Sequence, residues 1–154
     1  MSKTRIAING FGRIGRSAFK IAHKDKHLEV VAVNDLTDSK TLAHLLKYDT
    51  AYGVYEEDVR HEPGFLVVGK RPIPVLAEKD PSKLPWKDLK IDVVLECTGL
   101  FVKDGAAKQH LAAGAKRVKV SAPTQGTGGI QTYLLGVNDL NYADDSVISN
   151  ASCT

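Results

Sequence analysis

Short apolar runs alternate along the chain with longer segments whose apolar residues recur every three or four positions. The first run covers residues 6–8, and residues 13–23 follow with apolar side chains at helical spacing. Similar runs predict further strands at 28–33, 91–97, 116–121, 132–136 and 146–149. Helical patterns predict two more helices, at 37–48 and 104–113. This alternation, with its short links, predicts an α/β fold with a doubly wound, mostly parallel sheet.

Residues 64–75 interrupt the alternation and predict a small antiparallel hairpin inserted between two strand–helix units. A glycine turn separates two apolar stretches of strand length. Pro72 and Pro74 lie in the second stretch and predict that its strand runs at an edge of the sheet, because proline cannot donate to a hydrogen-bond ladder. Further on, residues 125–129 are rich in glycine, and we interpret them as a connecting loop.

Three glycines follow the first predicted strand at the spacing of a dinucleotide-binding fingerprint. Gly10, Gly12 and Gly15 form the pattern G-x-G-x-x-G between a strand and a helix, which is the context that such a motif requires. In this interpretation Gly10 permits a tight turn, Gly12 lets the backbone approach a pyrophosphate, and Gly15 lets the helix lie close to the strand. The segment therefore predicts a Rossmann-type phosphate site at the N-terminus of the helix.

A carboxylate stands at the expected distance after this motif. Asp35 follows the second predicted strand and lies twenty positions beyond Gly15, where a residue that holds the adenosine ribose is expected. Its charge would repel a 2′-phosphate, so it predicts NAD rather than NADP as the cofactor. The alternative is that Asp35 serves only as a helix cap or turn residue.

Polar residues recur where the predicted strands end. Asn9, Asp35, Thr98 and Ser121 all take such positions, and parallel strands bring their carboxyl ends to one edge of the sheet, where ligands bind. Cys153 follows the last predicted strand at the same edge. A thiol in that place is a candidate nucleophile, with a buried structural thiol as the alternative.

Composition narrows the possible functions. The 154 residues, 43% of them hydrophobic and 25% charged, are typical of one globular domain. A net charge of +3 without runs of like charge predicts neither nucleic-acid nor membrane binding. Two cysteines and no signal-peptide pattern favour a reducing, cytoplasmic location. No metal site is expected, because His44 in the second predicted helix has no partner at ligand spacing.

The chain resembles the N-terminal, NAD-binding half of the phosphorylating glyceraldehyde-3-phosphate dehydrogenases. The segments that carry this resemblance are 9–16, 33–35, 46–49, 96–99, 121–123, 136–138 and 149–154. It implies a NAD-binding domain over residues 1–149, with residues 150–154 as the first of a catalytic domain.

The same resemblance implies a role for individual residues. Those implied to bind the cofactor are Asn9, Gly10, Gly12, Arg13, Ile14, Asp35, Lys79, Thr98, Gly99 and Ser121. Within this set, Arg13 and Ile14 would hold the pyrophosphate with their backbone, and Lys79 would lie by the adenine. Thr98, Gly99 and Ser121 would line the nicotinamide side. Cys153 would be the catalytic nucleophile, and Ser152 and Thr154 would bind the substrate or incoming phosphate.

The implied reaction converts glyceraldehyde 3-phosphate, inorganic phosphate and NAD to 1,3-bisphosphoglycerate and NADH. A thiohemiacetal and then a thioester would form on Cys153. The implied assembly is a homotetramer of the whole protein. We expect the 154-residue chain alone to be inactive, because all five histidines precede Cys153 and the family's base lies in the half beyond it. The alternatives are a whole protein that acts on erythrose 4-phosphate, or a free-standing nucleotide-binding or interaction module.

Overall fold

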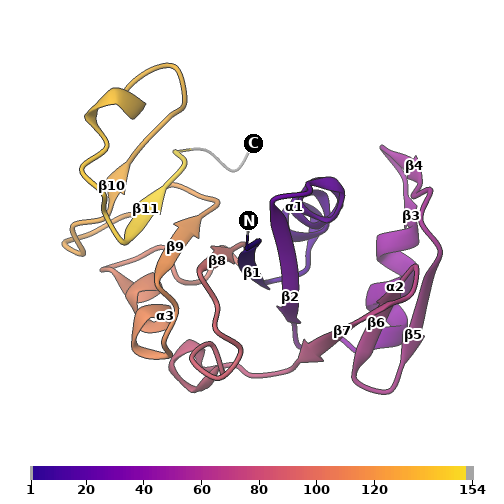
Figure 1. Ribbon diagram of the computed structural model, residues 1–154. Coiled ribbons are helices and arrows are strands. Elements are labelled where there is room, and N and C mark those ends of the chain that lie inside the picture. The colour runs from indigo at the N-terminus through magenta and orange to yellow at the C-terminus, as the bar shows by residue number, and fades with distance from the viewer. Residues whose placement is uncertain (1, 152–154) are drawn as a thin grey trace.

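The computed structural model describes residues 2–151 (Figure 1). Its helices are α1 (Arg13–Lys24), α2 (Ser39–Lys47) and α3 (Gln109–Ala112). Its strands are β1 (Thr4–Asn9), β2 (Leu28–Asn34), β3 (Tyr48–Asp49), β4 (Gly53–Val54), β5 (Val59–Glu62), β6 (Phe65–Val68), β7 (Arg71–Leu76), β8 (Val93–Glu96), β9 (Arg117–Val120), β10 (Gln131–Thr132) and β11 (Val147–Ser149). Short 3-10 turns cover Pro81–Lys83, Ala106–Lys108 and Asp139–Asn141.

Within these residues, nine strands form one sheet in the order β10-β11-β9-β8-β1-β2-β7-β6-β5. All neighbours from β10 to β7 are parallel, whereas β6 is antiparallel to both β7 and β5. From β1 the chain passes to β2, continues to β5 at the edge of the sheet, returns inward through β6 to β7, and then crosses back to β8 on the other side of β1. This reversal makes the β1–β8 boundary the topological switch point, where ligands bind in such folds. The predicted doubly wound, mostly parallel sheet with a small antiparallel insertion is confirmed.

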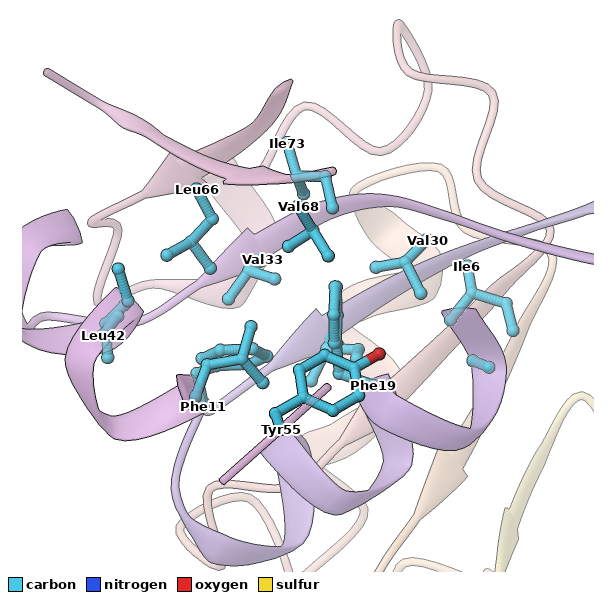
Figure 2. Close-up of a cluster of buried hydrophobic side chains, with 14 residues drawn as sticks. Ile6, Phe11, Phe19, Val30, Val33, Leu42, Tyr55, Leu66, Val68 and Ile73 are labelled. Atoms are coloured by element: carbon cyan, nitrogen blue, oxygen red, sulfur yellow. The ribbon is translucent and has the colours of Figure 1, made fainter. Parts of the chain in front are cut away.

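Alternation along the central strands sends side chains into two separate cores. Ile6 and Ile8 of β1 belong to one buried cluster with Phe11 and Phe19. Figure 2 shows Ile6, Phe11 and Phe19 in this cluster. Ala7, between them in the sequence, faces the opposite side and the cluster that surrounds Trp86. Because successive residues of a strand point to opposite faces, a continuous apolar run is what a sheet covered on both sides requires. The two cores therefore account for the apolar runs in the sequence.

The expectation that the 71–75 strand lies at an edge is wrong. β7 lies between β2 and β6, but it pairs with β2 only through Val75 and Leu76 at its C-terminal end. Pro72 and Pro74 lie in the part that pairs with β6 alone. In this part of β7 the side toward β2 has no hydrogen-bond ladder. The two prolines, which cannot donate a backbone hydrogen bond, therefore interrupt no pairing with β2. The proline rule holds for that part of the strand rather than for the strand as a whole.

Two predicted elements are shorter than expected. The helix predicted at 104–113 begins as a 3-10 turn and becomes α3 only at Gln109, because Asp104 (φ 48°) and Gly105 (φ 74°) are both left-handed. The strand predicted at 132–136 ends at Thr132 as β10. Beyond it the side chain of Asn138 accepts a hydrogen bond from the backbone of Leu134 (2.8 Å), which takes that donor away from any ladder.

Candidate cofactor-binding site

The turn between β1 and α1 depends on two of the three fingerprint glycines. Gly10 has φ 88°, and a Cβ there would lie 2.7 Å from the backbone nitrogen of Thr98. A Cβ on Gly15 would lie 2.1 Å from the carbonyl oxygen of Gly10, so only glycine lets α1 approach the turn. These contacts agree with the turn and close-packing roles expected of the two glycines.

Gly12 is different, because it faces open space. A Cβ at Gly12 would meet no atom within 4 Å, and the residue is the N-cap of α1 without any side-chain capping bond. The first turn of α1 contains no acidic residue. Backbone donors and the positive end of the helix dipole are therefore directed at an open surface, which suits an anion such as a pyrophosphate.

Asp35 is held at the end of β2 by backbone donors from two directions. Its Oδ2 accepts a hydrogen bond from the N–H of Phe11 (2.7 Å), and its Oδ1 accepts one from the N–H of Thr37 (2.9 Å). Asp38, and not Asp35, caps α2, because its side chain accepts from the backbone of Thr41. Asp35 is therefore a turn residue that also orients its carboxylate toward the glycine turn, and each oxygen keeps a lone pair for a ligand.

A cavity of about 470 Å³ lies between these segments. The predicted site residues that line it are Asn9, Gly10, Gly12, Asp35, Lys79 and Thr98. Its other lining residues are Asn34, Leu36, Glu78, Cys97, Leu100 and Phe101, which the sequence analysis did not assign to the site. The position of Asn34 and Leu36 next to Asp35 is a signal that could have identified them. Nothing local could have identified Phe101, which reaches the cavity through the loop after β8.

A second, smaller cavity of about 180 Å³ lies beside the first and contains two further predicted residues. Ile14 and Ser121 line it, together with Lys119 and Asn150. Cys97 lines both cavities, and burial raises the pKa of its thiol to about 11. A thiol with so high a pKa is a packing group rather than a nucleophile near neutral pH.

The remaining predicted residues divide into two groups. Arg13 and Gly99 are exposed and line neither cavity, although Arg13 is the first residue of α1 and Gly99 follows Thr98. Ser152, Cys153 and Thr154 lie outside the described residues. The described chain reaches the carboxyl end of β11, where the N–H of Asn150 donates to the carbonyl of Val120 (3.1 Å).

The described part of the chain contains neither a group of metal ligands nor a helix that could span a membrane. Among residues 2–151, no cluster of histidine, cysteine and carboxylate side chains could hold a metal ion. In the same part of the chain, no helix has the length and apolar character needed to cross a bilayer.

Comparisons with known proteins give one family. The glyceraldehyde 3-phosphate dehydrogenase NAD-binding domain family matches residues 4–104. Glyceraldehyde-3-phosphate dehydrogenase 1 of Streptomyces arenae is 52% identical over 153 residues, and the glyceraldehyde-3-phosphate dehydrogenase of Chlamydia pneumoniae is 50% identical over 153 residues. The glyceraldehyde-3-phosphate dehydrogenase of Mycoplasma pneumoniae is 50% identical over 155 residues.

These alignments cover nearly all of this chain and less than half of each relative. They include 97% of the chain for the Streptomyces and Chlamydia proteins and 99% for the Mycoplasma protein. The same alignments cover 45% of the first two relatives and 46% of the third. The family matched is defined by its NAD-binding domain, and the open Gly12 turn and the Asp35 carboxylate fit that cofactor. The chain therefore belongs to the glyceraldehyde-3-phosphate dehydrogenase family and represents its NAD-binding portion.

Proposed function

We propose that this chain binds NAD across the 470 Å³ cavity at the β1–β8 switch point. The observation that carries the proposal is the pairing of Asp35 with the glycine turn: its carboxylate accepts from Phe11 N–H at 2.7 Å, beside the open backbone of Gly12. On this proposal an acid that would bind the ribose lies next to a turn that would bind the pyrophosphate, as a dinucleotide requires. Arg13 and Ile14 would hold the pyrophosphate by their backbone, and Lys79 would lie by the adenine.

The cavity wall supports NAD over NADP. Among its lining residues within the described part of the chain, Lys79 is the one basic side chain, whereas Asp35 and Glu78 are acidic. A 2′-phosphate on the adenosine ribose would bring nearly two negative charges against Asp35. The nicotinamide end would extend past Thr98 and Gly99 toward Ser121, which lines the adjoining cavity.

The whole protein, on this proposal, oxidises and phosphorylates glyceraldehyde 3-phosphate. The Cys153 thiolate would add to the aldehyde carbon and form a thiohemiacetal, which becomes a thioester on loss of a hydride. Inorganic phosphate would then displace the thiolate and leave 1,3-bisphosphoglycerate, with Ser152 and Thr154 holding phosphate groups. Bound NAD supplies the hydride acceptor. The chain's own residues orient the ring and retain the acyl group on sulfur.

We propose that residues 1–149 bind the cofactor and that residues 150–154 are the start of a catalytic domain. The 154-residue chain alone would then bind NAD without turning over substrate. The five histidines all lie within the described residues, and none of them lines either cavity, which supports this proposal. The whole protein would work in the cytoplasm as a homotetramer with small-molecule substrates, and with neither nucleic acid nor membrane as a partner.

Calorimetric titration of the chain with NAD and with NADP tests the cofactor proposal. We expect NAD to bind more tightly, and Asp35→Asn to weaken NAD by about tenfold while strengthening NADP, since one lost charged hydrogen bond costs roughly 1.5–3 kcal/mol. Equal affinity for both cofactors in the unchanged chain would contradict the role of Asp35. NADH formation from glyceraldehyde 3-phosphate by this chain would contradict its proposed inactivity, and comparison with erythrose 4-phosphate on the whole protein would assign the substrate.

A further inference from the structure

A buried chain of polar side chains runs beneath the cavity and converges on one carboxylate. Glu96, at the end of β8, is 1% exposed, and both its neighbours Asn9 (1%) and His110 (0%) are also buried. The Nδ2 of Asn9 donates to Glu96 Oε2 at 2.6 Å, and His110 Nε2 lies 2.8 Å from the same oxygen. The backbone N–H and the hydroxyl of Thr98 both donate to the other oxygen, Oε1.

The backbone of Glu78 determines which end of the Asn9 amide faces Glu96, because it fixes the orientation of Asn34, which contacts Asn9. Asn34 accepts at Oδ1 from the N–H of Glu78 (2.9 Å) and donates from Nδ2 to the carbonyl of Glu78 (2.8 Å). This pair fixes which end of the Asn34 amide is nitrogen. Asn34 Nδ2 also donates to Asn9 Oδ1 (2.7 Å), so the nitrogen of Asn9 must face Glu96.

The direction of the bond from His110 is set in the same way by an indole. Trp86 is fully buried, and its Nε1–H can only donate, which it does to His110 Nδ1 at 2.9 Å. Since Nδ1 accepts, the proton of the neutral imidazole must be on Nε2, which therefore donates to Glu96. The contacts that Asn9, His110 and the Thr98 N–H make with Glu96 are thus donors, the Thr98 hydroxyl can donate as well, and a carboxylate offers an acceptor to each of them.

These contacts join the segments that carry the proposed NAD site. Asn9 and Asn34 directly precede Gly10 and Asp35, and Glu78 directly precedes Lys79. Thr98 packs against the glycine turn, because a Cβ on Gly10 would lie 2.7 Å from its backbone nitrogen. Asn9, Asn34 and Glu78 are therefore linked directly to one another, and the Glu96 carboxylate joins this group to the Thr98 segment.

We propose that Glu96 is a positioning residue for the cofactor, whose carboxylate holds the glycine turn and the Thr98 segment in the geometry that NAD binding needs. This inference rests on the proposed NAD function. Glu96 is not among the residues that line the cavity, so it acts through Asn9 and Thr98 rather than by contact with the ligand. Its influence should appear in the affinity for NAD beyond what a general loss of stability produces.

The isosteric variant Glu96→Gln gives the sharpest test. One orientation of the glutamine amide places its NH2 group against the donors of Asn9 and His110, and the other places it against the N–H of Thr98. The Thr98 hydroxyl can turn to accept, but the fixed donors cannot. We expect NAD to bind about tenfold more weakly, because a buried unpaired donor costs roughly 1–3 kcal/mol. Titration with NAD is done at a temperature where thermal unfolding, measured in parallel, shows each variant to be folded.

Val94→Ala is the matched control, because Val94 lies two residues away on β8, is fully buried and has no part in the polar chain. It should lower stability by roughly 1–3 kcal/mol and leave NAD affinity within about twofold. Trp86→Phe removes the donor that fixes His110 and should weaken NAD by about threefold although Trp86 does not line the cavity. If Glu96→Gln does not fold, Trp86→Phe still tests whether the polar contacts of Glu96 affect NAD affinity.

A double-mutant cycle asks whether hydrogen-bond direction is the cause. Asn9→Asp alone sets two carboxylates against each other, whereas Asn9→Asp combined with Glu96→Gln pairs an amide with a carboxylate at the same place. We expect the double variant to bind NAD at least threefold more tightly than the weaker single variant, which corresponds to a recovery of about 0.7 kcal/mol of binding free energy. If the unchanged chain binds NAD and both Glu96→Gln and Trp86→Phe bind it as Val94→Ala does, positioning by Glu96 is wrong and NAD binding stands. If the unchanged chain does not bind NAD, both proposals are overturned.

Discussion

Different interactions stabilise two regions of the molecule. One is the N-terminal βαβ unit, made of β1, α1 and β2, and the other is the C-terminal loop region, residues 131–145. In the first, Phe19 is 0% exposed and packs edge to face on Phe11, with 5.6 Å between the ring centroids. In the second, Leu135 is 87% exposed and Leu140 is 98% exposed. The first unit is stabilised by burial and close backbone approach, whereas the second depends on local polar contacts along the chain. The glycine turn therefore lies on a closely packed part of the molecule, whereas the C-terminal loop region leaves large apolar side chains exposed.

The largest expected effect comes from removing the aromatic centre of the βαβ unit. Phe19→Ala should lower the free energy of unfolding by roughly 3–5 kcal/mol, because a fully buried aromatic ring leaves a cavity. Leu140→Ala, a large apolar residue in the C-terminal loop region, should change it by less than about 0.5 kcal/mol. Urea denaturation of the two variants measures the comparison directly, and equal losses would show that burial does not separate the regions.

The next effect separates packing from binding within the glycine turn itself. Gly15→Ala should destabilise the chain by roughly 1–3 kcal/mol, because its Cβ would lie 2.1 Å from the carbonyl oxygen of Gly10. Gly12→Ala, whose Cβ would meet no atom within 4 Å, should keep its stability and weaken NAD by about tenfold. Thermal unfolding and calorimetric titration of both variants are the measurements. A Gly12→Ala variant that binds NAD normally would remove the pyrophosphate from that position.

A smaller effect is expected in the C-terminal loop region. Asn138 accepts at Oδ1 from the N–H of Leu134 (2.8 Å) and donates from Nδ2 to the carbonyl of Thr132 (2.9 Å). Asn138→Ala should therefore speed amide hydrogen exchange at Leu134 while lowering global stability by about 1 kcal/mol or less. Amides of β1 serve as the internal control. Faster exchange in β1 as well would mean that the two regions unfold as one unit.

The smallest effect is a pH dependence in the βαβ unit. Burial lowers the pKa of His23, which stacks on Phe19, below its ordinary value of 6.5. The unfolded chain therefore binds this proton more readily, so the contribution of His23 is fully present above pH 6.5 and is lost as the pH falls through the lower folded-state pKa. His23→Gln should flatten the fall in melting temperature between about pH 7 and about pH 5. An unchanged slope in this variant would assign the acid sensitivity to other groups.

Short-range patterns account for most of the fold that sequence analysis predicted. The β1 turn, α1 and β2 follow from apolar spacing and three glycines within 31 residues, 4–34, and each observed element lies within two residues of its predicted ends. The predicted boundaries of helices and strands were less accurate where one or two residues set the local backbone conformation. Asp104 and Gly105 delay the start of α3 by their left-handed φ angles, and the side chain of Asn138 ends β10. Neither effect changes the hydrophobic pattern on which the predictions rested.

The sequence by itself determined the class of sheet, the position of the glycine turn and the acid at the end of β2, because each depends on residues close together in the chain. Only the tertiary structure decided that β7 is internal while its prolines are unpaired toward β2, since this depends on where a ladder begins. It also decided that Asn9 meets Glu96, 87 positions away, and that Asn34 meets Glu78, 44 positions away. Hydrogen bonds over such separations form only once the strands are side by side, and so no local pattern encodes the carboxylate beneath the proposed cofactor site.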